Sequence, residues 1–192
     1  CRSRRSSATA ARRSPASVFS GALVLIHDET IDRTSDSRGA VREMTLAELA
    51  RVDAGCPAVF GDRFRGERIP TLEDALALLL SLGMGFNLEV KPCPGLERET
   101  SHAALAVVAR CWPARAPVPV ISSFRAASLE AAREAAPSLP RGYLAERLEG
   151  DWVGAARALG CATIHPGFRE LTRAQVAEAH RHGFPVLVWT VN

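Results

Sequence analysis

The sequence predicts an α/β fold of the (β/α)₈ TIM-barrel type, in an incomplete form with about six of the eight strands. Short apolar segments alternate with segments of helical periodicity, which is typical of parallel βαβ units. Polar residues directly follow the apolar segments, where barrel enzymes carry their functional groups. The chain has 192 residues, whereas a closed barrel usually needs about 250. We therefore expect a partial barrel.

The predicted strands are short apolar segments bounded by turn residues. The first ends directly before a cluster of polar residues, and the last ends the sequence without a following helix. The predicted strands are residues 22–26, 86–90, 118–122, 142–145, 162–165 and 184–191.

The predicted helices combine a polar first residue with apolar residues three and four positions apart. Thr45 and Glu48 form a capping box at the start of a short helix. Thr71 caps a helix that ends before Gly83, and Thr172 opens another with Gln175 at its third position. The remaining predicted helices are residues 97–111, 125–136 and 151–159.

Charge is distributed unevenly along the chain, whose formal net charge is +3. Residues 1–20 contain five arginines, no acidic residue and no hydrophobic period. We expect this segment to be disordered or separate from the fold, and residues 21–192 to form the domain. The remaining chain is slightly acidic, which gives no electrostatic footprint for nucleic acid. No apolar segment reaches the roughly 18 residues of a membrane span.

The five cysteines have no spacing typical of a zinc site or a disulfide framework. Free thiols of this kind are typical of a reducing compartment. Residues 1–20 also lack the apolar region of a secretory signal. We therefore predict a cytoplasmic protein.

His27 lies at the end of the first predicted strand and is followed by polar residues. This is where barrel enzymes position catalytic groups. Its ordinary pKa, about 6.5, suits proton transfer near neutral pH. A structural role is the alternative.

Glu89 and Lys91 are two positions apart on a predicted strand, so both point to the same face. Lys91 is the single lysine of a chain that otherwise uses arginine. A carboxylate could bind a divalent cation, and an ammonium could bind phosphate. A buried ion pair without a ligand is the alternative.

Several separate motifs together resemble the glycerophosphodiester phosphodiesterase family, especially its bacterial cytosolic type. These motifs cover roughly residues 22–192 and occur in the family's order. The resemblance implies a TIM barrel of the phospholipase C-like phosphodiesterase architecture. It also implies hydrolysis of glycerophosphodiesters to an alcohol and glycerol 3-phosphate with a divalent cation, Ca²⁺ or Mg²⁺. The motifs are His27-Asp-Glu-Thr-Ile-Asp-Arg-Thr34, Glu48-Leu49 with Asp53-Ala-Gly55, Ile69-Pro-Thr-Leu-Glu73, Asn87-Leu-Glu-Val-Lys91, Ser122-Ser-Phe124 and Val188-Trp-Thr-Val-Asn192.

The resemblance assigns roles to five positions. His27 matches one of two acid/base histidines, and Glu89 matches a metal-ligand glutamate. Lys91 matches a lysine that contacts phosphate. Trp189 matches the aromatic residue at the substrate pocket, and Phe124 is expected to line that pocket as well.

The sequence also departs from the family pattern. The family's His-Arg-Gly, Pro-Glu-Asn-Thr and Glu-x-Asp motifs, which supply the second histidine and most metal carboxylates, do not occur here. One carboxylate does not satisfy a hard cation that prefers six or more oxygen ligands.

Two hypotheses remain from the sequence. The chain is a hydrolytic domain in truncated form, or it is an inactive remnant that still binds phosphate. Sphingomyelinase D-like and phosphoinositide-cleaving barrels fit the Glu-Val-Lys and Trp-Thr-Val-Asn motifs less well. The expected partner is a small glycerophosphodiester, and the open edges of a partial barrel could allow self-association.

Overall fold

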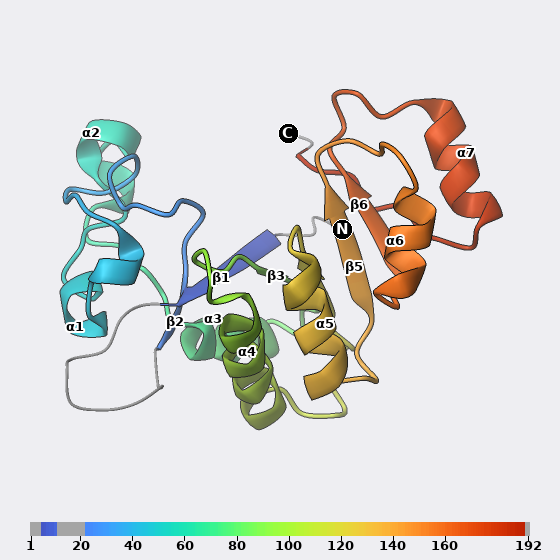
Figure 1. The fold of residues 1–192 in the computed structure, drawn as a ribbon. Coiled ribbons are helices and arrows are strands. Elements are labelled where there is room, and N and C mark those ends of the chain that lie inside the picture. Colours follow the sequence, from blue (N-terminus) through green and yellow to red (C-terminus); the bar gives the residue numbers. More distant parts are fainter. Residues whose placement is uncertain (1–4, 11–21, 191–192) are drawn as a thin grey trace.

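The protein, described here by a computed structural model, is built around a six-stranded mixed sheet (Figure 1). The structure describes residues 5–10 and 22–190. Strands β1 and β3 to β6 are parallel, and β2 is antiparallel to β1. In spatial order the strands are β2 (Leu23–Leu25), β1 (Arg5–Ala10), β3 (Asn87–Val90), β4 (Val120–Ser123), β5 (Arg141–Ala145) and β6 (Thr163–Pro166).

The helices follow the predicted pattern closely. Capping boxes at Thr45, Thr71 and Thr172 are all formed, because each hydroxyl accepts the N–H three residues later. No helix in the described residues is long and apolar enough to cross a membrane. The helices are α1 (Leu46–Leu49), α2 (Pro57–Phe60), α3 (Leu72–Ser81), α4 (Glu97–Cys111), α5 (Ala126–Ala135), α6 (Trp152–Ala158) and α7 (Arg173–Arg181).

Three features differ from the sequence prediction. Residues 5–10, expected outside the fold, form β1 between β2 and β3. Backbone pairing explains this, since β1 satisfies the edge of β3 without needing an apolar side-chain pattern. The rest of the 1–20 segment lies outside the described residues. The strand at 22–26 is antiparallel, and residues 184–190 form isolated bridges beside β6 in place of a regular strand.

The alternation of β3 separates the helix-facing core from the functional face. Leu88 and Val90 are almost fully buried and pack with side chains of α3 and α4. Asn87, Glu89 and Lys91 line a cavity on the other face. Because one strand supplies both faces, core packing fixes the position of the polar side chains.

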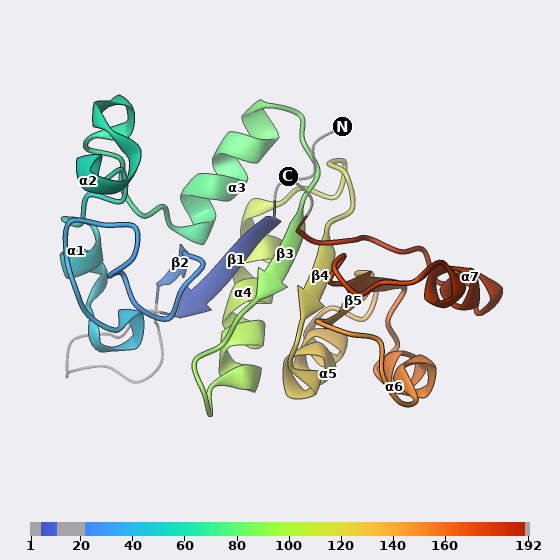
Figure 2. The same cartoon turned by 90° about the horizontal axis from the view of Figure 1, so that it is seen from above.

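Residues 28–69 form a lobe that lies beside the β2 end of the sheet (Figure 2). The lobe has its own small core, which includes Ile31, Val41 and Leu49. Its two ends meet where the Leu25 N–H donates to the Pro70 carbonyl over 2.9 Å. The lobe contains α1, α2 and two 3₁₀ turns, Val41–Glu43 and Asp62–Phe64. Of these, α2 and the 3₁₀ turns were not predicted, since one-turn segments show no periodicity.

Candidate functional site

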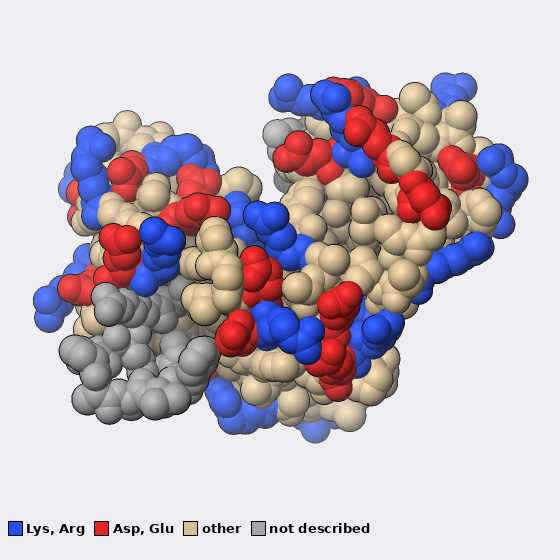
Figure 3. Space-filling model, viewed as in Figure 1, with Lys and Arg blue, Asp and Glu red and all other residues tan. Residues whose placement is uncertain are grey.

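A cavity of about 1050 Å³ lies at the carboxyl ends of the parallel strands, and all five predicted site residues line it. Figure 3 shows the molecule hollowed between the lobe and the part that contains β5 and β6, with basic side chains at the base of the hollow. The structure thus brings together residues far apart in the sequence. The residues are His27, Glu89, Lys91, Phe124 and Trp189.

His27 is held by a chain of polar contacts that starts at Arg33. The Arg33 Nε–H donates to Asp28 Oδ2 over 2.6 Å, and His27 Nδ1 lies 2.6 Å from Asp28 Oδ1. Hydrogen bonds from Arg33 and His27 lower the pKa of Asp28 from 3.8 to about 2. The carboxylate is therefore ionised at neutral pH and can only accept, so His27 Nδ1 carries a proton. This leaves His27 Nε2 as the nitrogen available to a ligand.

The lowered Asp28 pKa predicts a stability effect at acid pH. The folded pKa lies below the unfolded one, so the stabilisation is present above about pH 4 and is lost as pH falls towards 2. We expect Asp28→Asn to flatten the melting temperature profile between these pH values. Thermal unfolding followed by circular dichroism would measure this. Arg33→Gln should reproduce most of the change, and an unaltered profile in both variants would contradict the prediction.

Lys91 directly follows β3 and forms a hydrogen bond to the backbone that follows β2. Its Nζ–H donates to the His27 carbonyl oxygen over 2.7 Å. This contact holds the ammonium next to the backbone that positions the His27 imidazole. A phosphate in the cavity would therefore meet a cation and a proton-bearing side chain from two strands.

The described residues do not by themselves complete a divalent-cation site around Glu89. They contain no cluster of three or more His, Cys, Asp or Glu side chains suited to a metal. Strand β1, which lies directly beside β3 with Ser7 opposite Glu89, has no acidic residue in its sequence. A hard cation prefers six or more oxygens. Glu29 and Glu146 also line the cavity, but within the described residues they do not form such a cluster with Glu89.

Two aromatic side chains form one wall of the cavity. The Phe124 and Trp189 rings meet edge to face, with centroids 5.4 Å apart and planes at 88°. The Trp189 indole N–H donates to the His165 carbonyl oxygen over 2.9 Å. His165 itself is buried, and its Nε2 lies 2.8 Å from Thr163 Oγ1. The hydrogen bond fixes the indole, so its apolar face remains for a ligand.

Sequence reasoning missed several polar residues that also line the cavity, and four of them have charged or amide side chains. Glu29 follows His27 within the same motif, and Arg125 follows Phe124. Glu146 directly follows β5, so its position after a strand was the available signal. Asn87 is buried, and its Nδ2–H donates to Ser122 Oγ over 2.9 Å. Neither periodicity nor spacing distinguishes such residues from ordinary surface or core polar groups.

Comparison with known proteins shows the family of this chain. The model of the glycerophosphoryl diester phosphodiesterase family matches residues 20–192. The chain belongs to this family. A glycerophosphodiester phosphodiesterase from Caldanaerobacter subterraneus subsp. tengcongensis is 34% identical over 177 residues, which are 90% of this chain and 69% of the relative. One from Bacillus subtilis is 28% identical over 193 residues, covering 90% of this chain and 63% of the relative.

Solved structures of the family share the fold. An Oleispira antarctica phosphodiesterase, solved in complex with the product sn-glycerol-3-phosphate, has 32% identity and a TM-score of 0.88. The alignment covers 98% of this chain and 72% of that one. The domain is therefore of the TIM-barrel type, and the predicted fold class is confirmed. This glycerophosphoryl diester phosphodiesterase domain resembles enzymes that hydrolyse glycerophosphodiesters.

Proposed function

We propose that this domain binds the glycerol 3-phosphate portion of a glycerophosphodiester in the cavity and hydrolyses the diester to an alcohol and sn-glycerol 3-phosphate. The convergence of His27, Glu89, Lys91, Phe124 and Trp189 on one cavity carries this proposal. The product bound to the Oleispira antarctica relative supports the same ligand class.

Each side chain has a distinct role in the proposed complex. Lys91 supplies the positive charge for the phosphate, and the aromatic wall of Phe124 and Trp189 covers the carbon skeleton of glycerol. His27 donates or accepts a proton at Nε2, because its Nδ1–H is hydrogen-bonded to Asp28. Glu89 is the proposed ligand of a divalent cation, which would supply charge stabilisation when bound.

The binding part of the proposal is tested with sn-glycerol 3-phosphate alone. We expect isothermal titration calorimetry to detect binding to the chain and Lys91→Gln to weaken it by at least about tenfold, since a charge-assisted contact to phosphate is lost. Arg110→Gln is the control, because it removes the same charge on α4, outside the cavity. Equal affinity in the wild type and Lys91→Gln would reject the role of Lys91.

We also infer a cytoplasmic location, as the thiol chemistry supports. Four described cysteines are free, and three of these are buried. Burial raises the pKa of the Cys161 thiol to about 11 and also raises the pKa of Cys93. These thiols are protonated at neutral pH and are poor nucleophiles. Self-association through the β2 edge of the sheet remains a separate proposal, which size-exclusion chromatography would test.

A further inference from the structure

The cavity is lined by two exposed side chains of opposite charge that have no role in the proposed hydrolysis. Arg125 lies two residues after β4, and Glu146 directly follows β5. These strands are neighbours, with Ser123 opposite Tyr143. The two side chains therefore leave adjacent strands at the same edge of the sheet.

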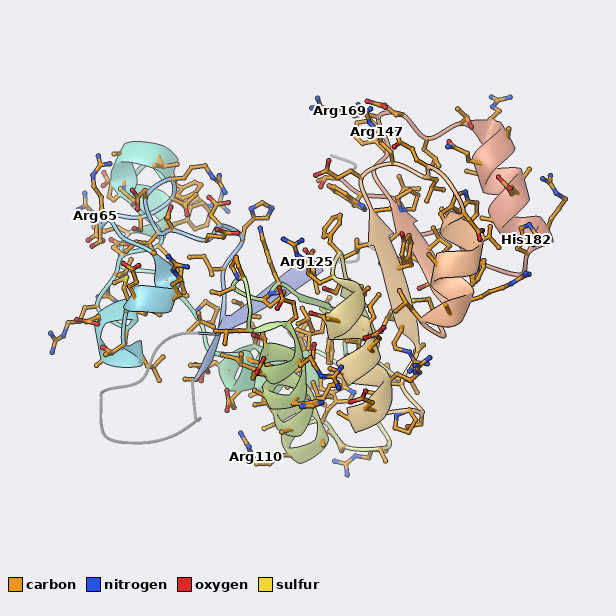
Figure 4. All side chains as sticks on the ribbon, viewed as in Figure 1. Arg65, Arg110, Arg125, Arg147, Arg169 and His182 are labelled. Carbon is orange, nitrogen blue, oxygen red and sulfur yellow. The ribbon has the colours of Figure 1, made fainter. Side chains whose placement is uncertain are left out.

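Arg125 has a fixed backbone and an available guanidinium. Its N–H donates to Ser123 Oγ over 3.1 Å, and the Ser123 hydroxyl donates to the Val90 carbonyl over 2.7 Å. Its own carbonyl accepts the Ser128 N–H at the start of α5. Many arginines of this protein contact carboxylates, Arg98 and Arg110 among them. Within the described part of the chain, Arg125 has no such ion pair, and Figure 4 shows it at the hollow between the lobe and β5.

Glu146 lies beside the aromatic wall. A Cβ on Gly167 would lie 2.7 Å from the Glu146 carbonyl oxygen and 3.7 Å from Cζ2 of Trp189, so these backbones are closely packed. Among the residues that the structure describes, the Glu146 carboxylate forms no ion pair. Besides Glu29 of the lobe, the cavity thus offers one cation and one anion that form no ion pair among the described residues, and both follow neighbouring strands.

We propose that Arg125 and Glu146 select a diester whose alcohol is a zwitterionic amino acid of the serine type, with the carboxylate bound by Arg125 and the ammonium by Glu146. This inference rests on the proposed function, in which Lys91 binds the phosphate. An ethanolamine or choline group would satisfy Glu146 alone and leave Arg125 unpaired. A second glycerol would satisfy neither charge. Selection therefore follows from charge complementarity at two points.

Calorimetry with three diesters and one reference ligand tests this inference. The diesters are glycerophosphoserine, glycerophosphoethanolamine and glycerophosphoglycerol, and the reference is sn-glycerol 3-phosphate, which has no head group. We expect the wild type to bind the serine diester about fivefold more tightly than the ethanolamine diester, since partly exposed ion pairs contribute modestly. This preference should shrink at high ionic strength.

Two variants separate the contributions of the charges. Arg125→Gln should abolish the preference for serine over ethanolamine and leave the affinity for the ethanolamine diester unchanged. Glu146→Gln should weaken both amine-bearing diesters about threefold relative to glycerophosphoglycerol. Arg110→Gln and Glu73→Gln are matched controls, since these two residues pair with each other outside the cavity.

The outcomes distinguish a failure of the head-group assignment from a failure of the proposed function. Normal binding of sn-glycerol 3-phosphate with equal affinity for serine and ethanolamine diesters would overturn the head-group assignment alone. A serine preference that persists in Arg125→Gln would do the same. Loss of all binding, including that of sn-glycerol 3-phosphate, would overturn the proposed function and this inference together.

Discussion

The 192-residue chain is expected to hydrolyse glycerophosphocholine at least about 100-fold more slowly than a version that carries the family's missing motifs. A lost acid or base partner costs roughly 10²–10⁴-fold, and incomplete cation binding removes charge stabilisation as well. This version, called the comparison protein below, has His-Arg-Gly, Pro-Glu-Asn-Thr and Glu-x-Asp motifs in place of residues 1–20. Release of glycerol 3-phosphate is measured with millimolar Ca²⁺ or Mg²⁺.

Glu89→Gln in the comparison protein is the decisive variant. It should abolish the metal-dependent turnover that the added motifs confer, because the proposed cation ligand on β3 is removed. Fast hydrolysis by the unmodified chain, sensitive to chelators, would show that other residues complete a metal site. An inactive comparison protein would instead favour a domain that binds the diester without cleaving it.

Replacing Gly142 by alanine is expected to destabilise the fold by about 1–3 kcal/mol or more, because overpacking a buried site forces neighbours to shift. A Cβ at this position would lie 2.5 Å from both Cε1 and Nε2 of His165, whose side chain is almost fully buried. Urea unfolding monitored by tryptophan fluorescence would give the change in the free energy of unfolding.

A double-mutant cycle identifies the cause of this destabilisation. In a His165→Ala background, Gly142→Ala should cost much less, because the atoms that clash have been removed. Equal costs in both backgrounds would show that the clash with His165 is not the reason. His165→Ala measured alone supplies the remaining corner of the cycle.

Local patterns predicted most of the elements but not how the first strands pair. The capping boxes at Thr45 and Thr71 and the periodicity of α4 depend on neighbouring residues, so the sequence specifies them directly. Strand β1 depends on backbone pairing with β3, a contact between residues about 80 positions apart. An Arg-Ser-Ser-Ala-Thr-Ala segment contains no signal for such a partner. The direction of β2 is likewise set by β1.

The sequence predicted those residues of the candidate site that belong to a recognisable motif. All five residues chosen from the motifs line the cavity, although their roles stay predictions. The chain of contacts from Arg33 through Asp28 to His27 needed coordinates, because hydrogen-bond geometry cannot be read from spacing. Arg125 and Glu146 were missed because an exposed charged residue after a strand resembles any surface charge. Only their shared cavity distinguishes them.

The two ends of the lobe lie next to each other, so the lobe can be altered separately from the rest of the domain. Residues 28–69 leave and rejoin the body between Leu25 and Pro70, which share a backbone hydrogen bond, and Val24 bridges Thr71 at the same place. An insertion with adjacent ends can change in length or sequence at little entropic cost to the rest of the chain. The lobe is therefore an exchangeable module. Swapping it between family members would vary one side of the cavity entrance and keep Glu89, Lys91 and the aromatic wall unchanged.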